Sequence, residues 1–313
     1  MTDKQINKWL RRRFTPAGWL LVGYYVVMNL LCILAMAWEA VAQMLQNGFE
    51  TVDPEALMQN AWGYIVSIFV ALVILYAWKG PVYWREEIFS REKKMRPGVF
   101  FSVLCLCMGT QMVNSLWVMG LEFLFSLSGK SLMPLLENVS GSSGSVSMFL
   151  YASILAPISE ELLFRGFLLR SLRPYGKRFA ILGSALFFGL FHGNLVQTPY
   201  AFLMGLLLGY VAVEYSVSWA VALHMFNNFV LADLLTRLSM LLPQLVGDMI
   251  SLTLLGGALV ISVILLAVKR QEIMDHIRSE WIDRRVLKSF LTCGGTIALT
   301  VLMLINILLM LPK

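Results

Sequence analysis

Three short polar clusters interrupt segments that are otherwise strongly apolar, and their side chains are of the types that catalyse reactions. In chain order they are Glu160-Glu161-x-x-x-Arg165, Phe188-x-x-x-His192 and His224-x-x-x-Asn228. Ionisable groups inside a bilayer are costly and usually face a bundle interior or a wet cavity. Two acids, an arginine, two histidines and an amide on separate apolar segments therefore indicate one shared polar site.

The first cluster contains an expected ion pair and a second acid. Glu161 and Arg165 lie four residues apart, so they share a helix face and can pair. Glu160 points about 100° away around the same helix, which leaves it free to act on another group. The alternative is a purely structural ion pair at the end of a span, but pairing does not explain the second carboxylate.

The other two clusters supply groups for acyl transfer. His224 and Asn228 share a helix face, and both can donate hydrogen bonds to an oxyanion. His192 can act as an acid or a base near neutral pH. A glutamate and a histidine can deprotonate a water while His224 and Asn228 hold the charge that develops on an attacked carbonyl. This combination is typical of a hydrolase in the membrane.

The same side chains leave the cofactor undecided. Two histidines and a carboxylate also form catalytic zinc sites. However, the chain has no His-Glu-x-x-His motif, and the donors are spread over three segments. A metal-free glutamate mechanism is favoured, zinc is the alternative, and no residue is assigned as a metal ligand.

The composition requires a membrane environment. The chain has 313 residues, of which 58% are hydrophobic and 14% are charged, and its mean hydropathy is +0.72. Soluble domains have about a quarter charged residues. The net charge of +6 is explained by basic loops that face an anionic leaflet. With no nucleic-acid motif present, membrane lipid is the expected partner, and nucleic acid is not.

Nine apolar runs are expected to be helical spans, or eight if one run is re-entrant or lies on the surface. They are Ala17–Trp38, Ala61–Trp78, Gly98–Leu121, Val146–Leu169, Phe179–Leu195, Pro199–Val213, Trp219–Leu235, Met249–Val268 and Phe290–Leu311. The expected fold is an all-α polytopic membrane protein with 8–9 transmembrane helices. It forms a single integral-membrane domain over residues 1–313, with residues 146–235 as the catalytic core.

The charges of the loops predict the orientation. Of the 25 basic residues, 22 lie in the N-terminal segment and in the connections after the second, fourth and eighth runs. Basic loops stay on the cytoplasmic side. A multi-pass protein of the cell membrane, of the bacterial plasma-membrane type, with a cytoplasmic N-terminus is therefore expected.

The depth of His192 is a difficulty for a shared site. Counted from Arg178 at 1.5 Å per residue, His192 would lie about 20 Å inside the membrane, whereas His224 lies at about 9 Å. Either the helix starts nearer Ser184, with Lys177–Gly183 along the interface, or it is strongly tilted. The first arrangement is expected because it brings the groups to one level.

The order of the three motifs resembles the CPBP family, which comprises type II CAAX prenyl endopeptidases and bacteriocin-processing or immunity proteins often labelled Abi. The matching stretch runs from Glu160 through Asn228, and the flanking spans match only as generic hydrophobic helices. The resemblance implies an eight-helix-type membrane fold around a cytoplasm-facing polar cavity, and it implies proteolysis.

The resemblance also implies roles for single residues. It implies that Glu160 and His192 are catalytic and activate water, and that His224 and Asn228 are catalytic and form the oxyanion hole. It implies a supporting role for Glu161, Arg165 and Phe188.

The expected function is therefore that of an intramembrane endopeptidase that hydrolyses peptide bonds of membrane-associated or lipidated substrates. The alternative is a non-catalytic membrane partner or immunity protein that binds a peptide in the same cavity. Against this, every reactive position is filled. A transporter is disfavoured because no internal repeat is evident. A prenylated C-terminus, a leader peptide and a membrane protein's span remain equal candidates for the substrate.

Overall fold

The computed structural model describes residues 2–48, 52–140, 145–279 and 282–312, and within these ranges all regular structure is helical, with no strand. The α-helices are α1 (Asp3–Asn47), α2 (Pro54–Met58), α3 (Trp62–Tyr83), α4 (Pro97–Ser126), α5 (Met133–Ser140), α6 (Val146–Leu150), α7 (Ala156–Glu161), α8 (Arg170–Leu172), α9 (Lys177–Phe191), α10 (Thr198–Glu214), α11 (Val217–Phe226), α12 (Leu235–Met240), α13 (Gln244–Val268), α14 (Arg270–Ser279), α15 (Arg284–Leu291) and α16 (Gly294–Leu309). Four π-helical stretches, η1 (Trp84–Ile88), η2 (Tyr151–Leu155), η3 (Leu162–Leu169) and η5 (Asn227–Leu234), and one 3₁₀ turn, η4 (Arg173–Tyr175), continue or join them.

The helices form an all-α, multi-pass membrane protein, as expected. Each of the nine apolar runs overlaps a helix. Five described segments are long and apolar enough to cross a membrane, namely Asp3–Gln46, Ala56–Ile88, Pro97–Ser126, Val146–Tyr175 and Gln244–Val268. The pair α15–α16, bent by 59°, would add a sixth, and α10 is a shorter apolar helix. The total of eight or nine spans stays a prediction.

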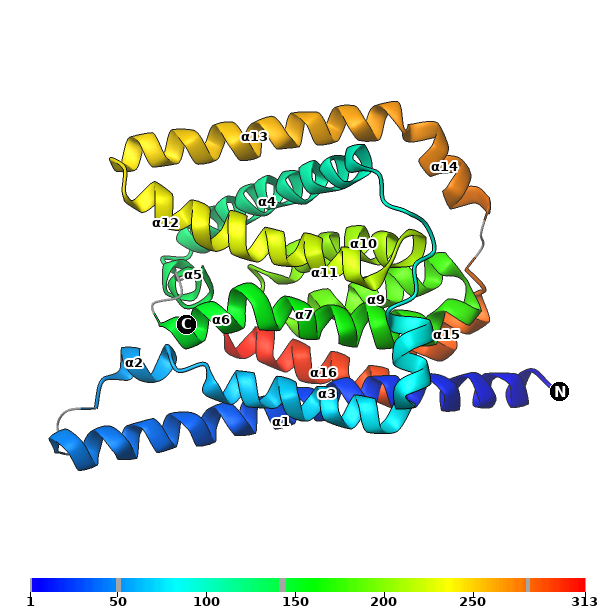
Figure 1. Cartoon of the computed structure of the whole chain (residues 1–313), viewed down its shortest axis with the longest axis horizontal. Coiled ribbons are helices and arrows are strands. Elements are labelled where there is room, and N and C mark those ends of the chain that lie inside the picture. The colour runs from blue at the N-terminus through cyan, green and yellow to red at the C-terminus, as the bar shows by residue number, and fades with distance from the viewer. Residues whose placement is uncertain (1, 49–51, 141–144, 280–281, 313) are drawn as a thin grey trace.

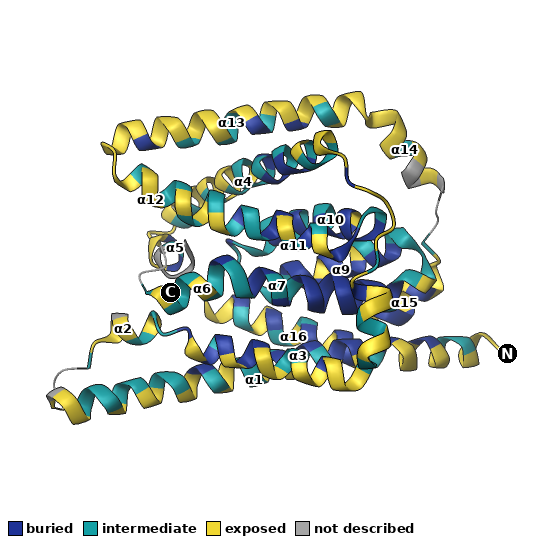
Figure 2. Ribbon diagram, viewed as in Figure 1, coloured by how far each residue is buried: buried dark blue, intermediate teal, exposed yellow. Residues whose placement is uncertain are grey.

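The motif-bearing helices lie between two outer layers. Helices α1, α3 and α16 pack along one side and α4 and α13 along the other, with α7, α9, α10 and α11 between them (Figure 1). The middle layer is also the most buried part of the protein, since the buried residues, coloured dark blue, gather there (Figure 2). All eight residues of η3 are buried. The outer helices therefore keep the polar motifs away from lipid.

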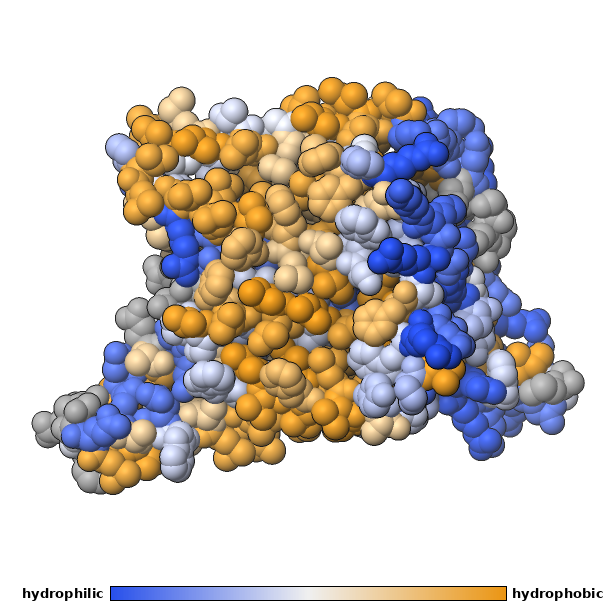
Figure 3. All heavy atoms as spheres, in the orientation of Figure 1, coloured by the Kyte–Doolittle hydropathy of each residue, from blue (hydrophilic) through white to orange (hydrophobic). Residues whose placement is uncertain are grey.

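Hydrophilic and hydrophobic surfaces are separated along the molecule. An apolar band crosses its middle, and hydrophilic residues cover the end at which the N-terminus, α14 and α15 lie (Figures 1 and 3). We call this the basic end, because the clustered basic residues of the sequence lie on these elements and on the neighbouring connections. It is the end that the loop charges predict to be cytoplasmic.

Ion pairs tie the connection between η1 and α4 to the basic end. Arg173 donates to Glu92 at 2.8 Å, and this hydrogen bond lowers the pKa of the Glu92 carboxyl below its usual value. Lys93 and Lys177 both donate to Glu214, at 2.7 and 3.1 Å. The connection is thereby held against the ends of α8, α9 and α10.

Small residues let α9 and α10 approach closely. A Cβ atom on Gly205 would lie 2.9 Å from the Cα of Ala185, and one on Gly189 would lie 2.9 Å from the carbonyl oxygen of Thr198. Such distances leave no room for a side chain, so backbone meets backbone, as is common where membrane helices pack through small residues.

The expectation that the helix before His192 begins near Ser184 is wrong. Gly176, with φ of 120°, breaks the preceding turn, and α9 begins at once at Lys177 and runs without interruption to Phe191. His192 therefore lies at the end of α9 that is remote from the basic end. His192 nevertheless lies near the other polar groups, because the ring of Phe188 contacts both His192 and His224.

The close approach of α9 and α10 makes Gly205→Ala a sharp test of the packing. We expect the change to lower the stability by about 1–3 kcal/mol, because the added methyl group overpacks the contact with Ala185. The matched control is Gly256→Ala in α13, where nothing lies within 4 Å of the added Cβ and helix propensity favours alanine by about 1 kcal/mol. Thermal unfolding in detergent measures both, and equal midpoints would contradict the close contact.

Candidate active site

The first motif lies where an irregular helix changes its winding. Glu160 and Glu161 end α7, between the π-helical stretches η2 and η3. Short π-helical turns in α-helices are frequent at functional sites. In η3, two backbone carbonyl oxygens accept hydrogen bonds from side chains of neighbouring helices. Ser184 donates to Phe164 O and Tyr83 donates to Gly166 O, each at 2.8 Å.

Pro157 leaves a second carbonyl available in the same span. The backbone N–H of Ala156 donates to Tyr151 O, five residues back. The next donor in that pattern would be Pro157, which has no N–H. The carbonyl oxygen of Ala152 therefore lacks its backbone partner and accepts instead from Nδ2 of Asn228, at 3.0 Å.

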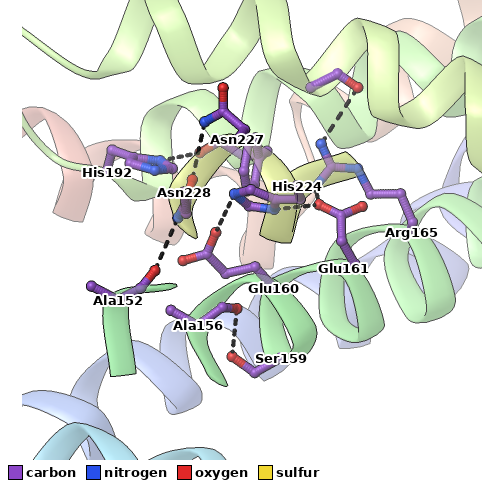
Figure 4. A network of polar contacts seen from close by, with 12 residues as sticks. Ala152, Ala156, Ser159, Glu160, Glu161, Arg165, His192, His224, Asn227 and Asn228 are labelled. Atoms are coloured by element: carbon purple, nitrogen blue, oxygen red, sulfur yellow. Dashed lines mark hydrogen bonds and ion pairs between the residues drawn. The ribbon is translucent and has the colours of Figure 1, made fainter. Parts of the chain in front are cut away.

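The expected pair between Glu161 and Arg165 is present and fully enclosed. Nη1 of Arg165 donates to Oε1 of Glu161 at 2.8 Å, and both side chains are 0% exposed. The same Oε1 lies 2.9 Å from Nδ1 of His224 (Figure 4). The sequence predicted the arginine as partner of this acid but not the histidine.

His224 lies between the two acids of the first motif. Its Nε2 is 3.9 Å from Oε2 of Glu160, while its Nδ1 faces Glu161. Figure 4 shows the imidazole between the two carboxylates. Glu160 keeps 22% of its side chain exposed, in contrast to the enclosed Glu161. One acid is thus locked by its partners, and the other remains accessible.

The ring of Phe188 connects the separate parts of the cluster. The guanidinium carbon of Arg165 lies 4.1 Å from its centroid, a cation–π contact. Its ring also meets His192 and His224 edge to face, with centroids 5.1 and 5.7 Å apart. This aromatic side chain packs against three polar groups at once.

His192 is hydrogen-bonded through one of its two ring nitrogens. Its Nδ1 lies 2.8 Å from the carbonyl oxygen of Phe188. A carbonyl only accepts, so this contact places the proton on Nδ1 and leaves the lone pair on Nε2. Among the described residues, no direct hydrogen bond joins His192 to either glutamate, and Figure 4 shows it at the end of the cluster opposite Arg165.

Asn228 belongs to a chain of amides that the sequence did not predict. Its Oδ1 accepts from Nδ2 of Asn227 at 3.1 Å. In turn, Oδ1 of Asn227 accepts from Nε2 of Gln111 at 2.9 Å and from the hydroxyl of Tyr200 at 3.0 Å. The signals in the sequence are weak, namely one glutamine in the apolar run of α4 and an asparagine inside the motif, directly before Asn228.

A comparison with known protein families identifies this region. Residues 142–230 match the family described as Type II CAAX prenyl endopeptidase Rce1-like. The chain carries an Rce1-like domain. The matched residues contain all three polar motifs, which confirms the resemblance to the CPBP family. The match supports a CAAX protease-like hydrolase that acts on a peptide or protein in a membrane. No curated protein and no solved structure matches the chain at a significant level.

The side chains of the Rce1-like domain, as placed, do not fit a metal ion. In the described parts of the chain, no three His, Cys, Asp or Glu side chains converge as metal ligands would. The two nitrogens of His224 face Glu161 and Glu160, and the third group near them along its helix is the amide of Asn228. The cofactor stays a matter for experiment.

The enclosed pair predicts a large effect of Arg165→Ala on stability. Removing the arginine leaves a buried carboxylate without its cation, at a cost of about 3–5 kcal/mol. The double variant Glu161→Gln with Arg165→Ala should recover part of this loss. Arg85→Ala is the control, since the Arg85–Glu86 pair is exposed and such pairs contribute about 0–1 kcal/mol. Unfolding in detergent would contradict the pairing if the double variant were no more stable than Arg165→Ala.

Proposed function

We propose that this protein is an intramembrane endopeptidase in which Glu160 and His192 activate a water molecule and His224 and Asn228 stabilise the oxyanion. The observation that carries the proposal is the position of His224 between a locked and an accessible glutamate. Glu161, held by Arg165, fixes the ring through Nδ1, and Nε2 is thereby directed to the side on which Glu160 lies.

The hydrolytic step assigns a separate task to each acid. Glu160 accepts a proton from water as the water oxygen bonds to the scissile carbonyl carbon, and the carbonyl electron pair moves to oxygen. When the tetrahedral intermediate collapses, the carbon–nitrogen bond breaks and Glu160 returns the proton to the departing amine. The lone pair on Nε2 of His192 orients the water by accepting its second proton in a hydrogen bond.

The contact of His224 with Glu161 supports its role at the oxyanion. Nδ1 donates to the carboxylate of Glu161, so the role at the oxyanion requires a proton on Nε2 as well, which is the imidazolium form. In that form Nδ1–H donates to Glu161 and Nε2–H is available to the developing oxyanion. Fixed donors in an enclosed site stabilise such charge strongly, because they need not reorganise during the reaction.

Asn228 offers the second donor. Its Nδ2 carries two protons, and one of them is engaged by the carbonyl of Ala152. The other is available to the oxyanion beside Nε2–H of His224. The carboxamide is held at both ends, because its Oδ1 accepts from Asn227.

The membrane topology completes the proposal. The basic end faces the cytoplasm of a bacterial-type cell, in line with the distribution of basic loops. Membrane-associated peptides, including lipidated ones, are the proposed substrates, and nucleic acid has no part in the function. The metal-free mechanism is part of the proposal.

Replacement of the accessible acid tests the catalytic assignment. Glu160→Gln keeps the side-chain volume but cannot accept the proton of water, so we expect cleavage to be abolished and thermal stability to be retained. The control is Glu272→Gln, at an exposed position. Mass spectrometry of membrane peptides from cells with either variant, followed by assays of purified protein on prenylated and unprenylated peptides, measures the loss. Near-native cleavage by Glu160→Gln would refute the mechanism, and a native protein that binds but never cleaves peptides would favour the binding-protein alternative.

Asn228→Ala separates the glutamate mechanism from a zinc mechanism. Loss of one oxyanion donor should lower kcat about 10²–10³-fold with little change in KM. Purified protein should resist chelators and contain no stoichiometric zinc. Elemental analysis that finds about one zinc per chain, lost in His224→Ala and needed for activity, would overturn the metal-free mechanism and leave the protease assignment intact.

A further inference from the structure

A branched chain of neutral hydrogen bonds joins α4 and α10 to Asn228. Two donors, Nε2 of Gln111 on α4 and the hydroxyl of Tyr200 on α10, converge on Oδ1 of Asn227 at 2.9 and 3.0 Å. The carboxamide of Asn227 then donates to Asn228 at 3.1 Å. Asn227, at the centre of the chain, is only 3% exposed, and its partners are partly buried.

The chain has a direction, because Gln111 and Tyr200 both donate to the same oxygen of Asn227 in the structure. A carboxamide can turn by 180° and exchange its donor for its acceptor. Two donors at one end of Asn227 fix its oxygen there and its N–H groups at the other end. Oδ1 of Asn228 must then face Asn227, so its Nδ2 points away, toward Ala152 and the catalytic groups (Figure 4).

We propose that Gln111, Tyr200 and Asn227 are positioning residues, which act through Asn228 by fixing which end of its carboxamide faces the reaction. This inference rests on the proposed function, because it assigns the orientation of a donor to the oxyanion. Without the two donors, Asn227 could turn over, and its oxygen would then draw Nδ2 of Asn228 away from the substrate.

Burial favours this role over simple packing. Apolar side chains could fill the same space between α4, α10 and η5 without any polar group. Buried polar networks are costly unless every member is satisfied, and they then specify one arrangement. A glutamine in the apolar run of α4 that reaches an asparagine of another span is therefore explained by the orientation that it imposes.

A double-mutant cycle tests whether the chain acts through Asn228. The combination Tyr200→Phe with Gln111→Leu removes both donors and should lower kcat about tenfold, as expected for lost hydrogen bonds between neutral groups. KM should stay within about twofold of its native value, because little ground-state binding is lost. In an Asn228→Ala background, the same pair of changes should have no further effect on kcat.

Tyr83→Phe is the matched control. It also removes a tyrosine hydroxyl that donates inside the protein, but to Gly166 O at 2.8 Å, away from the amide chain. Any loss of kcat that it causes should be the same with and without Asn228. Full additivity of the Tyr200 and Gln111 changes with Asn228→Ala would overturn the inference.

A near-isosteric change separates orientation from packing. Gln111→Glu keeps the shape of the side chain but, when ionised, replaces the donor with an acceptor that favours the turned carboxamide of Asn227. It should therefore lower kcat more than Gln111→Leu does. If only packing mattered, the glutamate would be the milder change, and that result would overturn the inference.

Thermal stability gives a reading that does not depend on activity. The Tm lost through Tyr200→Phe should be smaller in the Asn228→Ala background than in the native one, because the chain has already been broken. If the Tm change depends on Asn228 in this way but the native protein shows no peptidase activity, the proposed function is refuted and the amide chain is supported. Absence of coupling in Tm would refute the chain itself.

Discussion

The carboxylate of Glu161 is the constraint on which the site depends. A charge that is fully enclosed within membrane-spanning helices must be paired and hydrogen-bonded, because its desolvation is otherwise too costly. Arg165 supplies the cation from the same helix, and His224 supplies a second contact from another. The need to satisfy this one acid brings α11 against α7 and η3 and sets the direction of the imidazole.

Irregular helices make these contacts possible. A regular α-helix satisfies its own carbonyls and presents only side chains, whereas η2 and η3 offer backbone oxygens to Asn228, Ser184 and Tyr83. The contacts between spans are therefore directional hydrogen bonds to the backbone, in addition to the close glycine-mediated packing of α9 on α10. Such contacts fix the rotation of each span about its own axis. The different surroundings of Glu160 and Glu161 depend on that rotation.

Contacts within one helix could be predicted from the sequence, and contacts between helices could not. The spacing of Glu161 and Arg165 predicts their pairing, because helical geometry alone brings them together. The bond from His224 to Glu161 and the amide chain through Asn227 depend on how spans pack, which no spacing encodes. The start of the helix before His192 was mispredicted for a related reason, since the contacts of Phe188 with His192 and His224 depend on how the spans pack.

The π-helical winding of η3 has a consequence for the permitted length of this segment. A helix that loses one residue changes the rotation of everything beyond it, by about 100° for α-helical winding and by somewhat less for the wider turns of a π-helix. Arg170, which directly follows η3 and is only 3% exposed, lies 3.6 Å from Glu92 and 3.9 Å from Glu87. A deletion within η3 would rotate this arginine out of register with both acids even if every remaining residue were unchanged. The number of residues between the two glutamates and the basic end is thus restricted, as well as their identity.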